Sequence, residues 1–469
     1  MIFIMLLQMV DIPILLLIFL NDVDFQNALL PIIRTTLPLA INFSSQGLTL
    51  RKIYKLIFLS SIKVATFSFL YNARMNSLSF SEKNKQPLII GIDATNIRHG
   101  GGRTHLIELL HAAMPHQYGI SKVTVWGSSA TLALIEDRPW LEKISPTFLN
   151  GSLLLRVFWQ RFFLTRAAHT ARCNVLFVPG GSYSGDFKPV VAMSQNLLPF
   201  EWHELKRYGW SRLSFKLLLL RFVQGYTFRR ATSSIFLSEY AKDSVQAITG
   251  KLAGGSATIP HGLNERFYIQ PRSQKSIEAY SISTPFHLLY VSIIDQYKHQ
   301  WHVVEAVAKL RQATGWPLRL ELVGPAYGPA LKRFQRSLQH YDPDGQWVKY
   351  YGPIPYDQMN AIYQNADAAV FASSCENMPN ILLECMAAGL PIACSKMGPM
   401  PEVLRKSGVY FDPESAESIS AALRKLVGSP NLRQRLAHEG FALAKAYSWQ
   451  RCSNETFGFL AKVANSKNI

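Results

Sequence analysis

Cysteine is scarce in this sequence, and its spacing excludes the two common uses of clustered cysteines. The chain has five cysteines in 469 residues. Their number is odd and no two have the C-x-x-C spacing of a zinc or redox site, so we expect neither a disulfide framework nor a zinc site. We interpret them as reduced core residues of a cytosolic chain: Cys173, Cys375, Cys385, Cys394 and Cys452.

Acidic residues are also scarce. The chain has 31 Asp and Glu against 49 Lys and Arg, a formal net charge of +18. Such an excess predicts an anionic partner: a membrane surface, a phosphorylated substrate or nucleic acid. Hydrophobic residues make up 48% of the chain, which excludes wholesale disorder. At about 150 residues per domain, the length predicts two or three domains.

The first 85 residues lack the basic segment that opens a secretory signal peptide. The apolar run Met1–Leu20 would just span a bilayer, but Asp11 and Pro13 fall at mid-span, where a carboxylate is costly. A second run, Ile53–Leu70, contains lysines, and the basic stretch Arg34–Lys63 predicts that everything downstream stays cytoplasmic. Residues 1–85 are therefore either a hydrophobic membrane anchor or an extension that does not belong to the working protein.

Two halves that alternate strand and helix follow. A polar segment after Met75 leads into the first expected strand, Pro87–Asp93. Further strands are expected at VTVWG, NVLFV, VVAM and SSIFL, and then at HLLYVS, LRLELV, VKYYG, AAVFAS and PIACS. The Gly-, Ser- and Pro-rich segment Lys251–Pro285 is the expected hinge. The pattern predicts an α/β fold with domains at 86–265 and 280–469, the second ending in helices from Ala416 to Asn465.

A glycine-rich loop follows the first expected strand. Gly100, Gly101 and Gly102 open a helix, where a phosphate can approach the backbone and meet free N–H groups. The spacing is neither G-x-G-x-x-G nor a P-loop, because no G-K-[ST] follows. A phosphate-binding loop and an ordinary flexible turn both remain open.

The segment FASSCENMPNILLECMAAGLPIACS places two carboxylates at one helix start. A strand ends near Ser373, Pro379 suits the first turn of a helix, and Gly389 ends that helix. Glu376 lies in the loop before the helix and Glu384 little more than one turn inside it. Both can therefore face the crevice at the carboxyl ends of the strands. The alternative is a capping carboxylate and a surface helix residue.

At these positions the sequence resembles a known family. Glu376 and Glu384 match the E-x7-E motif of the family 4 retaining glycosyltransferases (glycosyl transferases group 1), and HLLYVS and GPMPEV are similar as well. The resemblance implies the GT-B fold, in which two Rossmann-like domains face each other across a cleft. It also implies that Glu376 contacts the donor sugar, that Glu384 holds the ribose of the nucleotide, and that Gly101 and Gly102 face the donor phosphates.

The chain departs from the family pattern around the diphosphate. The family usually has an arginine and a lysine after the first strand of the second domain; Lys298 is kept, but Ile293 stands where the arginine is expected. ENMPN replaces the commoner E-G-F-G, so Asn377 and the amides near Asn380 would serve the sugar. This departure resembles the branch that makes bacterial surface polysaccharides. The resemblance makes Glu376 and Lys298 the expected catalytic residues.

Polar residues of the first domain are expected on the acceptor side. VAMSQNLLPFE follows a strand, and the resemblance places Gln195 and Asn196 near the acceptor; ordinary loop residues are the alternative. His261 in IPHGLNERF resembles a turn near the hinge, and its expected role is structural. Asp342 and Asp344 spell D-x-D, but their position in a turn predicts a solvated loop and no metal site.

Basic and aromatic residues are interleaved in Trp202–Arg230, as suits a helix on an anionic membrane surface. RNA-binding proteins have a similar composition, but no nucleic-acid motif accompanies it here. A charged helix packed by its leucine face is the remaining alternative. The basic residues of the stretch are Lys206, Arg207, Arg212, Lys216, Arg221, Arg229 and Arg230.

The resemblance and these patterns together predict a glycosyltransferase. It would move a sugar from a nucleotide-diphosphate sugar to a glycan or lipid-linked glycan, with retention, in cell-surface polysaccharide synthesis at the inner face of the plasma membrane. No cofactor, metal or nucleic-acid partner is expected. The competing interpretations are a GT-B nucleotide-sugar epimerase or hydrolase, which would want further carboxylates and a histidine in the crevice, and a non-catalytic nucleotide-sugar-binding scaffold, which the missing arginine at Ile293 favours.

Overall fold

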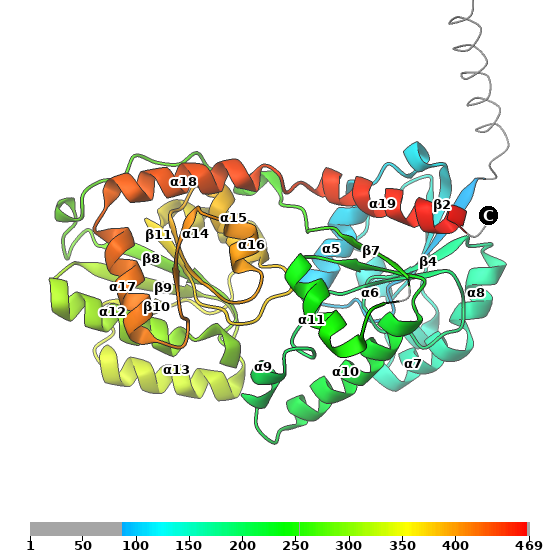
Figure 1. Ribbon diagram of the computed structural model, residues 1–469, viewed down its shortest axis with the longest axis horizontal. Coiled ribbons are helices and arrows are strands. Elements are labelled where there is room, and N and C mark those ends of the chain that lie inside the picture. Colours follow the sequence, from blue (N-terminus) through cyan, green and yellow to red (C-terminus); the bar gives the residue numbers. More distant parts are fainter. Residues whose placement is uncertain (1–86, 253, 467–469) are drawn as a thin grey trace, which may run out of the picture. The chain divides into compact units, whose positions relative to one another are not determined.

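Two parallel sheets with helices on both faces form the described part of the chain (Figure 1). This computed structural model describes residues 87–252 and 254–466. The apolar runs Met1–Leu20 and Ile53–Leu70 lie outside the described residues, so the anchor stays a prediction. Within 87–252 and 254–466, no helix combines the length and the hydropathy needed to cross a bilayer.

The first sheet has seven parallel strands in the order β3-β2-β1-β4-β5-β6-β7. Its central strands are almost wholly buried, because helices cover both faces. The sequences of β4 and β5 are therefore continuous apolar runs, whereas the equally buried β6 begins with two serines. In register, Ile92 of β1 lies opposite Val125 of β2 and Phe177 of β4. The strands are β1 (Leu88–Asp93), β2 (Ile120–Trp126), β3 (Leu141–Ile144), β4 (Val175–Val178), β5 (Val190–Met193), β6 (Ser233–Phe236) and β7 (Gly255–Thr258). The helices are α5 (Gly100–His111), α6 (Ser129–Leu132), α7 (Leu153–Phe162), α8 (Leu164–Thr170), α9 (Trp202–Lys206), α10 (Arg212–Arg230) and α11 (Glu239–Thr249).

The second sheet has six parallel strands in the order β10-β9-β8-β11-β12-β13. Leu288 of β8 lies opposite Leu320 of β9 and Ala368 of β11. The strands are β8 (Phe286–Val291), β9 (Leu318–Val323), β10 (Val348–Tyr350), β11 (Ala368–Phe371), β12 (Ile392–Ser395) and β13 (Gly408–Phe411). The helices are α12 (Gln300–Thr314), α13 (Gly328–Tyr341), α14 (Met359–Asn365), α15 (Asn380–Ala387), α16 (Met400–Leu404), α17 (Ala416–Val427), α18 (Pro430–Ala444) and α19 (Trp449–Asn465).

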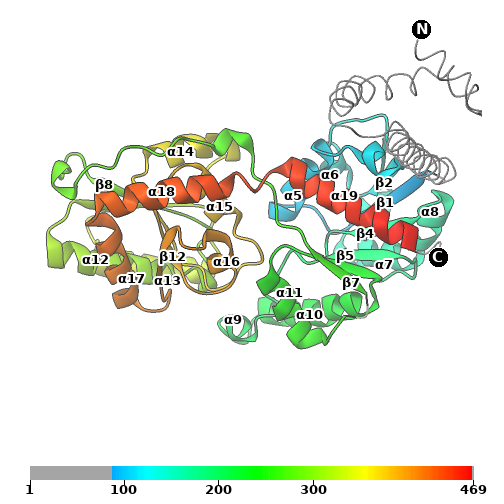
Figure 2. The same cartoon turned by 45° about the horizontal axis from the view of Figure 1, so that its top comes forward.

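The last helix returns to the first sheet. The tail predicted as helical from Ala416 to Asn465 is divided into α17, α18 and α19, and Pro430 begins the second of these. Figures 1 and 2 show α19 lying against the elements of the first sheet, where it contacts α5, β1 and β4. This helix was expected to belong to the second domain, but it packs against the first.

All ten strands expected from the sequence are present, and three more accompany them. The additional strands β3, β7 and β13 lie at or next to sheet edges and are only partly buried, so their sequences lack the continuous apolar runs of the central strands. Strand β7 lies within the segment Lys251–Pro285, which the sequence had suggested was a hinge throughout. The hinge is therefore shorter than expected.

The strand order identifies where ligands bind. In each sheet the order reverses once, between β1 and β4 in the first and between β8 and β11 in the second. Open α/β sheets bind ligands at the carboxyl ends of the strands beside such a reversal. The loops that follow β1, β8 and β11 are those in which the sequence analysis had placed the glycine-rich turn, Lys298 and Glu376.

Candidate active site

Loops from both sheets line one cavity of about 550 Å³. Gly100 and Gly101 are the first residues of α5, whereas Lys298, Glu376 and Glu384 come from the loops after β8 and β11 and from α15. This volume lies within the range of small-molecule sites, about 300–1,000 Å³. The cavity is therefore large enough for a substrate that contacts both domains.

A second cavity of about 210 Å³ shares Gly101, Glu376 and Asn380 with the first. It extends the site toward the loop after β5. All nine site residues expected from the sequence line one or both cavities: Gly101, Gly102, Gln195, Asn196, Lys298, Glu376, Asn377, Asn380 and Glu384. The structure thus brings these residues together, while the chemical role of each stays a prediction.

Lys298 and Glu376 form an ion pair at the wall of the larger cavity. The Lys298 side chain is 5% exposed and that of Glu376 15%. The Lys298 ammonium also lies 4.9 Å from the centroid of the Tyr297 ring, and the Tyr290 hydroxyl donates to the Lys298 carbonyl oxygen at 2.6 Å. The cation is thus held in place from several sides, and its charge is directed to Glu376.

Glu384 is the most strongly perturbed carboxyl of the site. Its oxygens accept hydrogen bonds from the hydroxyls of Tyr363 at 2.6 Å and Tyr356 at 3.2 Å. Burial raises the pKa of Glu384 to about 7, although these two hydrogen bonds and the charge of Arg266 act in the opposite direction. Perturbed carboxyls of this kind concentrate at functional sites. No motif of the sequence pointed to the two tyrosines.

Two asparagines of the site have buried acceptors with no partner among the described residues. These are the side-chain oxygens of Asn377 and Asn380, which both line the smaller cavity. The Asn377 amide group donates to the Ser194 hydroxyl at 3.3 Å. Unsatisfied buried acceptors are rare in proteins, and here they are positioned to accept from a ligand's hydroxyl groups.

The backbone near Asn380 differs from the expectation in one respect. Its N–H donates to the Met378 carbonyl oxygen at 3.0 Å and is not free for a ligand, whereas the amides near Asn380 were expected to serve the sugar. The turn before α15 closes on itself in this way because Pro379 precedes the helix and offers no side-chain cap.

The glycine-rich loop favours glycine at one position for backbone reasons and holds a close contact at another. Gly100 has φ = +67°, in the left-handed region. A Cβ atom on Gly102 would lie 2.5 Å from Oε1 of Gln195, so a larger residue there would displace the end of the Gln195 side chain. No described side chain caps the start of α5, so its first N–H groups and the positive end of its dipole face the cavity.

Gln195 and Asn196, the residues expected on the acceptor side, have different surroundings. Gln195 packs against Gly102, as described above. Asn196 is exposed, and its Oδ1 accepts from the N–H of Leu198 at 3.2 Å in a local turn. Both residues line the smaller cavity.

A histidine pair lies at the smaller cavity, which one of its members, His261, lines. Nδ1 of His261 is 2.7 Å from Nδ1 of His105 on α5, and both rings are buried beside Trp449 of α19. Burial lowers the pKa of His261 to about 3. The sequence had suggested a structural role for His261, but nothing in it pointed to His105.

The larger cavity has little positive charge of its own. Ile293, which stands where an arginine was expected, lines the larger cavity, and among the described residues that line it Lys298 is the one cation.

Asp342 is buried, whereas it was expected to be solvated. Its carboxylate accepts hydrogen bonds from the backbone N–H groups of Gln346, Trp347 and Val348. That carboxylate stabilises a turn.

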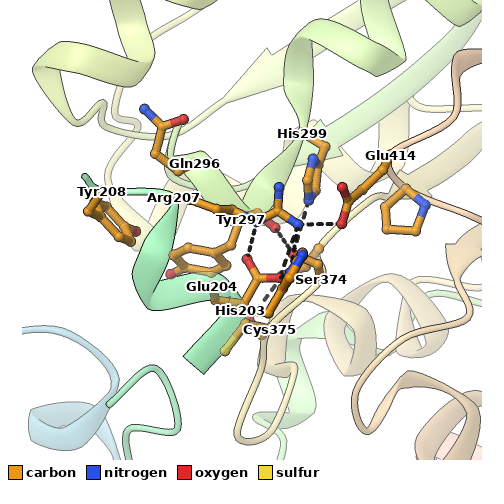
Figure 3. Close-up of polar contacts among 12 residues, drawn as sticks. His203, Glu204, Arg207, Tyr208, Gln296, Tyr297, His299, Ser374, Cys375 and Glu414 are labelled. Atoms are coloured by element: carbon orange, nitrogen blue, oxygen red, sulfur yellow. Dashed lines mark hydrogen bonds and ion pairs between the residues drawn. The ribbon is translucent and has the colours of Figure 1, made fainter. Parts of the chain in front are cut away.

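Arg207 joins the two domains and is not free to bind a membrane. Figure 3 shows its guanidinium between the carboxylates of Glu204 and Glu414, with His203 beside it. The ligand atoms of those three neighbours lie within 4.8 Å of one another, a spacing that would suit a metal ion, but the guanidinium already bonds to each of them. Arg207 therefore departs from its expected place among the exposed basic residues.

Comparisons with known proteins agree with this geometry. The family model described as "Glycosyl transferases group 1" matches residues 273–442. The O-antigen chain mannosyltransferase B of Escherichia coli is 26% identical over 222 residues, which cover 47% of this chain and 55% of that protein. The D-inositol 3-phosphate glycosyltransferase of Corynebacterium urealyticum is 24% identical over 172 residues, 35% of this chain and 40% of that protein. The chain thus spans about half the length of these curated relatives.

Solved structures match the fold over most of the chain. Anabaena Alr3699/HepE, in complex with UDP and glucose, superposes with a TM-score of 0.58 at 15% identity and covers 80% of this chain and 100% of that one. WaaG, a glycosyltransferase involved in lipopolysaccharide biosynthesis, has a TM-score of 0.57 at 14% identity and covers 80% and 99%. At these identities the likeness shows the fold alone.

The two facing parallel sheets and the shared cavity define a GT-B protein. Residues 273–442 match the group 1 glycosyltransferase model, and the chain is similar in sequence to an O-antigen mannosyltransferase and in fold to a lipopolysaccharide glycosyltransferase.

Proposed function

We propose that this protein transfers a sugar from a nucleotide-diphosphate sugar to a glycan or lipid-linked glycan, with retention at the anomeric carbon, in cell-surface polysaccharide synthesis. The observation that carries the proposal is the cavity that joins Gly101, Lys298, Glu376 and Glu384 from separate loops of the two domains. The names of the similar proteins, an O-antigen mannosyltransferase and a lipopolysaccharide glycosyltransferase, support the polysaccharide role.

The donor nucleotide would lie in the larger cavity. The ionised Glu384 is suited to accept from the ribose hydroxyls, and the start of α5 and Lys298 are suited to the diphosphate. Helix dipole and backbone N–H groups would thus supply part of the charge that the arginine missing at Ile293 would otherwise provide. We propose on the same grounds that the transfer needs no metal ion, since the D-x-D motif of the second domain uses Asp342 for a turn.

The sugar would lie between the cavities, near Glu376 and the free oxygens of Asn377 and Asn380. In the transfer, the bond from the anomeric carbon to the diphosphate oxygen breaks and a bond to the acceptor oxygen forms on the same face. The leaving group is already good, so positioning and charge stabilisation by fixed groups provide most of the catalysis. Gln195 and Asn196, on the first-domain side of the smaller cavity, would contact the acceptor.

Association with the cytoplasmic membrane face is part of the proposal. Twenty large apolar side chains are exposed among the described residues; eight lie between Phe148 and Phe163 and seven between Trp202 and Tyr226. The longer stretch Trp202–Arg230, which contains the second of these segments, carries six basic residues besides Arg207 and a single acidic one, Glu204. A surface both apolar and basic suits an anionic bilayer, where a lipid-linked acceptor would be found.

A thermal-shift panel of UDP-, GDP- and dTDP-sugars on the full-length protein tests the donor assignment. A ligand that binds only the folded protein raises its stability by mass action, so one nucleotide class should raise the melting temperature in a concentration-dependent way. Glu384→Ala should lose most of that shift. If no nucleotide sugar shifts the wild-type protein, the proposal is wrong.

A further inference from the structure

Two arginines at the carboxyl end of the first sheet lie close together and are fixed by backbone groups. Arg156 on α7 donates from Nη1 to the Thr95 carbonyl oxygen at 3.2 Å and to Oδ1 of Asn96 at 3.1 Å. Arg98, in the loop after β1, donates to the carbonyl oxygens of Gly151 at 3.2 Å and Asn150 at 3.4 Å. Both guanidinium groups are therefore positioned before any ligand arrives.

Their charges are not neutralised by carboxylates. Within the described ranges, no Asp or Glu forms an ion pair with Arg98 or Arg156, or with the neighbouring Arg103, which donates to the Arg98 carbonyl oxygen. Burial, and then the positive charge of Arg98, lowers the pKa of the Arg156 guanidinium. Nε of Arg156 is buried and has no hydrogen-bond partner among the residues described. An unpaired donor in an uncompensated cationic pair favours an anionic ligand.

Arg98 and Arg156 lie close to the two cavities of the candidate active site but line neither of them. Asn96 and Arg98 follow β1, and Gly180 follows β4, so they flank the reversal of strand order in the first sheet. A Cβ atom on Gly180 would lie 3.6 Å from Cβ of Asn96 and 3.7 Å from Cδ1 of Ile97. The same Ile97 atom lies 3.5 Å from the Cβ position of Gly102, a residue of the smaller cavity. Ile97 therefore separates the arginine pair from the proposed sugar site.

An exposed apolar surface adjoins the arginines on α7. Leu153, Leu154 and Leu155 directly precede Arg156 in the helix, and Phe158 and Phe162 follow it. Their exposed fractions are 53%, 81%, 45%, 46% and 62%. The helix is anchored on its inner side by Gln160, whose amide group donates to the Ser182 carbonyl oxygen at 3.0 Å. A ligand at Arg156 thus has a hydrocarbon surface beside its charged end.

We propose that Arg98 and Arg156 bind the phosphate group of the acceptor, which is a phosphate or diphosphate ester of a long hydrocarbon chain, and that this chain lies on the exposed face of α7. The inference rests on the proposed function and narrows its acceptor class to an anionic lipid. Planar guanidinium groups bind phosphate oxygens in pairs, which lysine cannot do, so two arginines suit this ligand.

Binding of farnesyl diphosphate to the full-length protein tests the proposal without using catalysis. Titration is carried out with UDP and GDP in excess, so that the donor cavity is not available to the probe's diphosphate. Arg98→Gln should weaken binding about tenfold or more, as expected for a lost hydrogen bond between charged groups. Arg98→Lys keeps the charge and should retain more of the affinity than Arg98→Gln. Arg166→Gln, which removes an exposed charge from α8, is the matched control and should bind as the wild type does.

Three further probes identify the source of the affinity. Farnesol and inorganic pyrophosphate should each bind much more weakly than farnesyl diphosphate, because each lacks half of the ligand. Dihexanoylphosphatidylglycerol, a phosphodiester headgroup on short chains, should also bind more weakly. Equal affinity for this phospholipid, or an equal effect of Arg98→Gln and Arg166→Gln, would overturn the proposal. Failure of the donor assignment would show separately, as the absence of any nucleotide-sugar shift.

Discussion

Lys298 and Glu376 are 78 residues apart in the chain but form an ion pair, because the loops after β8 and β11 meet at the larger cavity. Removing one member of a buried ion pair leaves the other charge without a partner. We expect Glu376→Leu to lower the free energy of unfolding by about 3 kcal/mol, within the range for such changes. The double variant Lys298→Met/Glu376→Leu should recover most of this loss, as measured by denaturant unfolding.

The double variant separates stability from function. If the pair served packing alone, restoring stability would restore turnover as well. We expect the double variant to remain inactive. A double variant that is both stable and fully active would contradict the placement of this pair in the site.

Lys298→Ala tests the diphosphate assignment. As the one cation among the described residues lining the larger cavity, Lys298 should contribute about 1.5–3 kcal/mol to donor binding or to the transition state, as hydrogen bonds to charged groups do. The measurement is kcat/KM for the donor identified by thermal shift. An unchanged value would show that other groups hold the diphosphate.

Glu384 should make stability fall as pH rises. Its folded pKa of about 7 lies above the ordinary 4.5, so between these values the folded protein holds a proton that the unfolded chain has released. Stability without ligand is therefore highest below about pH 4.5, falls through about pH 7 and then levels off. The total loss is on the order of 3 kcal/mol.

Glu384→Gln removes this ionisation but keeps an acceptor for the tyrosine hydroxyls. It should be more stable than the wild type at pH 8 by about 2–3 kcal/mol and little different at pH 5. Thermal unfolding at the two pH values measures the difference. An equal effect of Glu384→Gln at pH 5 and pH 8 would show that Glu384 is not the group responsible.

Arg207 should matter for stability more than its partner Glu414. The Glu204 side chain is 4% exposed and depends on Arg207, whereas that of Glu414 is 37% exposed. Arg207→Gln should therefore cost about 2–4 kcal/mol, and Glu414→Gln no more than about 1 kcal/mol, because exposed pairs contribute little. Denaturant unfolding of the two variants measures both values. The order would be reversed if the contact across the domains were the main one.

Membrane association should depend on charge at α9 and α10. The full-length protein should sediment with anionic vesicles, much less with neutral ones, and should be released as salt rises. Neutralising Lys206, Arg212 and Lys216 with Gln should weaken binding about a hundredfold, at about 1 kcal/mol per charge. Arg207 is left intact because it is ion-paired.

A matched control removes three charges from the second domain: Lys406, Arg424 and Lys425 to Gln. These exposed residues lie outside the proposed surface, and the control should bind anionic vesicles almost as the wild type does. An equal loss in both triple variants would show that net charge alone drives association. Binding that survives high salt would indicate hydrophobic insertion instead.

The sequence predicted the strands best where every residue of a strand is buried. Most central strands are apolar runs, such as β4, β5 and β11, because helices cover both faces, so the alternation with helices was readable in advance. Strand β7 is Gly-Ser-Ala-Thr and half exposed, and only its pairing with β6 makes it a strand. Such edge strands are set by tertiary contact, which local pattern does not encode.

The site was likewise predictable where its residues lie in one local motif, and not where distant elements meet. Glu376 and Glu384 lie in one local motif, so their shared crevice follows from a helix start and a strand end. The partners Tyr363, His105 and Arg207 are brought to their contacts by packing between distant elements, and nothing near them in the sequence marks them. Contacts of this kind, such as the pairing of Arg207 with Glu414, become visible only in the three-dimensional structure.

The central claim is that Glu376 acts on a sugar whose nucleotide is bound beside it. The direct measurement is the rate of nucleotide-diphosphate release at saturating donor and acceptor, for the wild type and for Glu376→Gln, with the nucleotide-sugar affinity of both proteins determined in parallel. We expect Glu376→Gln to bind the donor with similar affinity but to release product about a hundredfold more slowly or worse, as for the loss of one electrostatic contact to the transition state. Normal turnover by Glu376→Gln at saturating donor would contradict it.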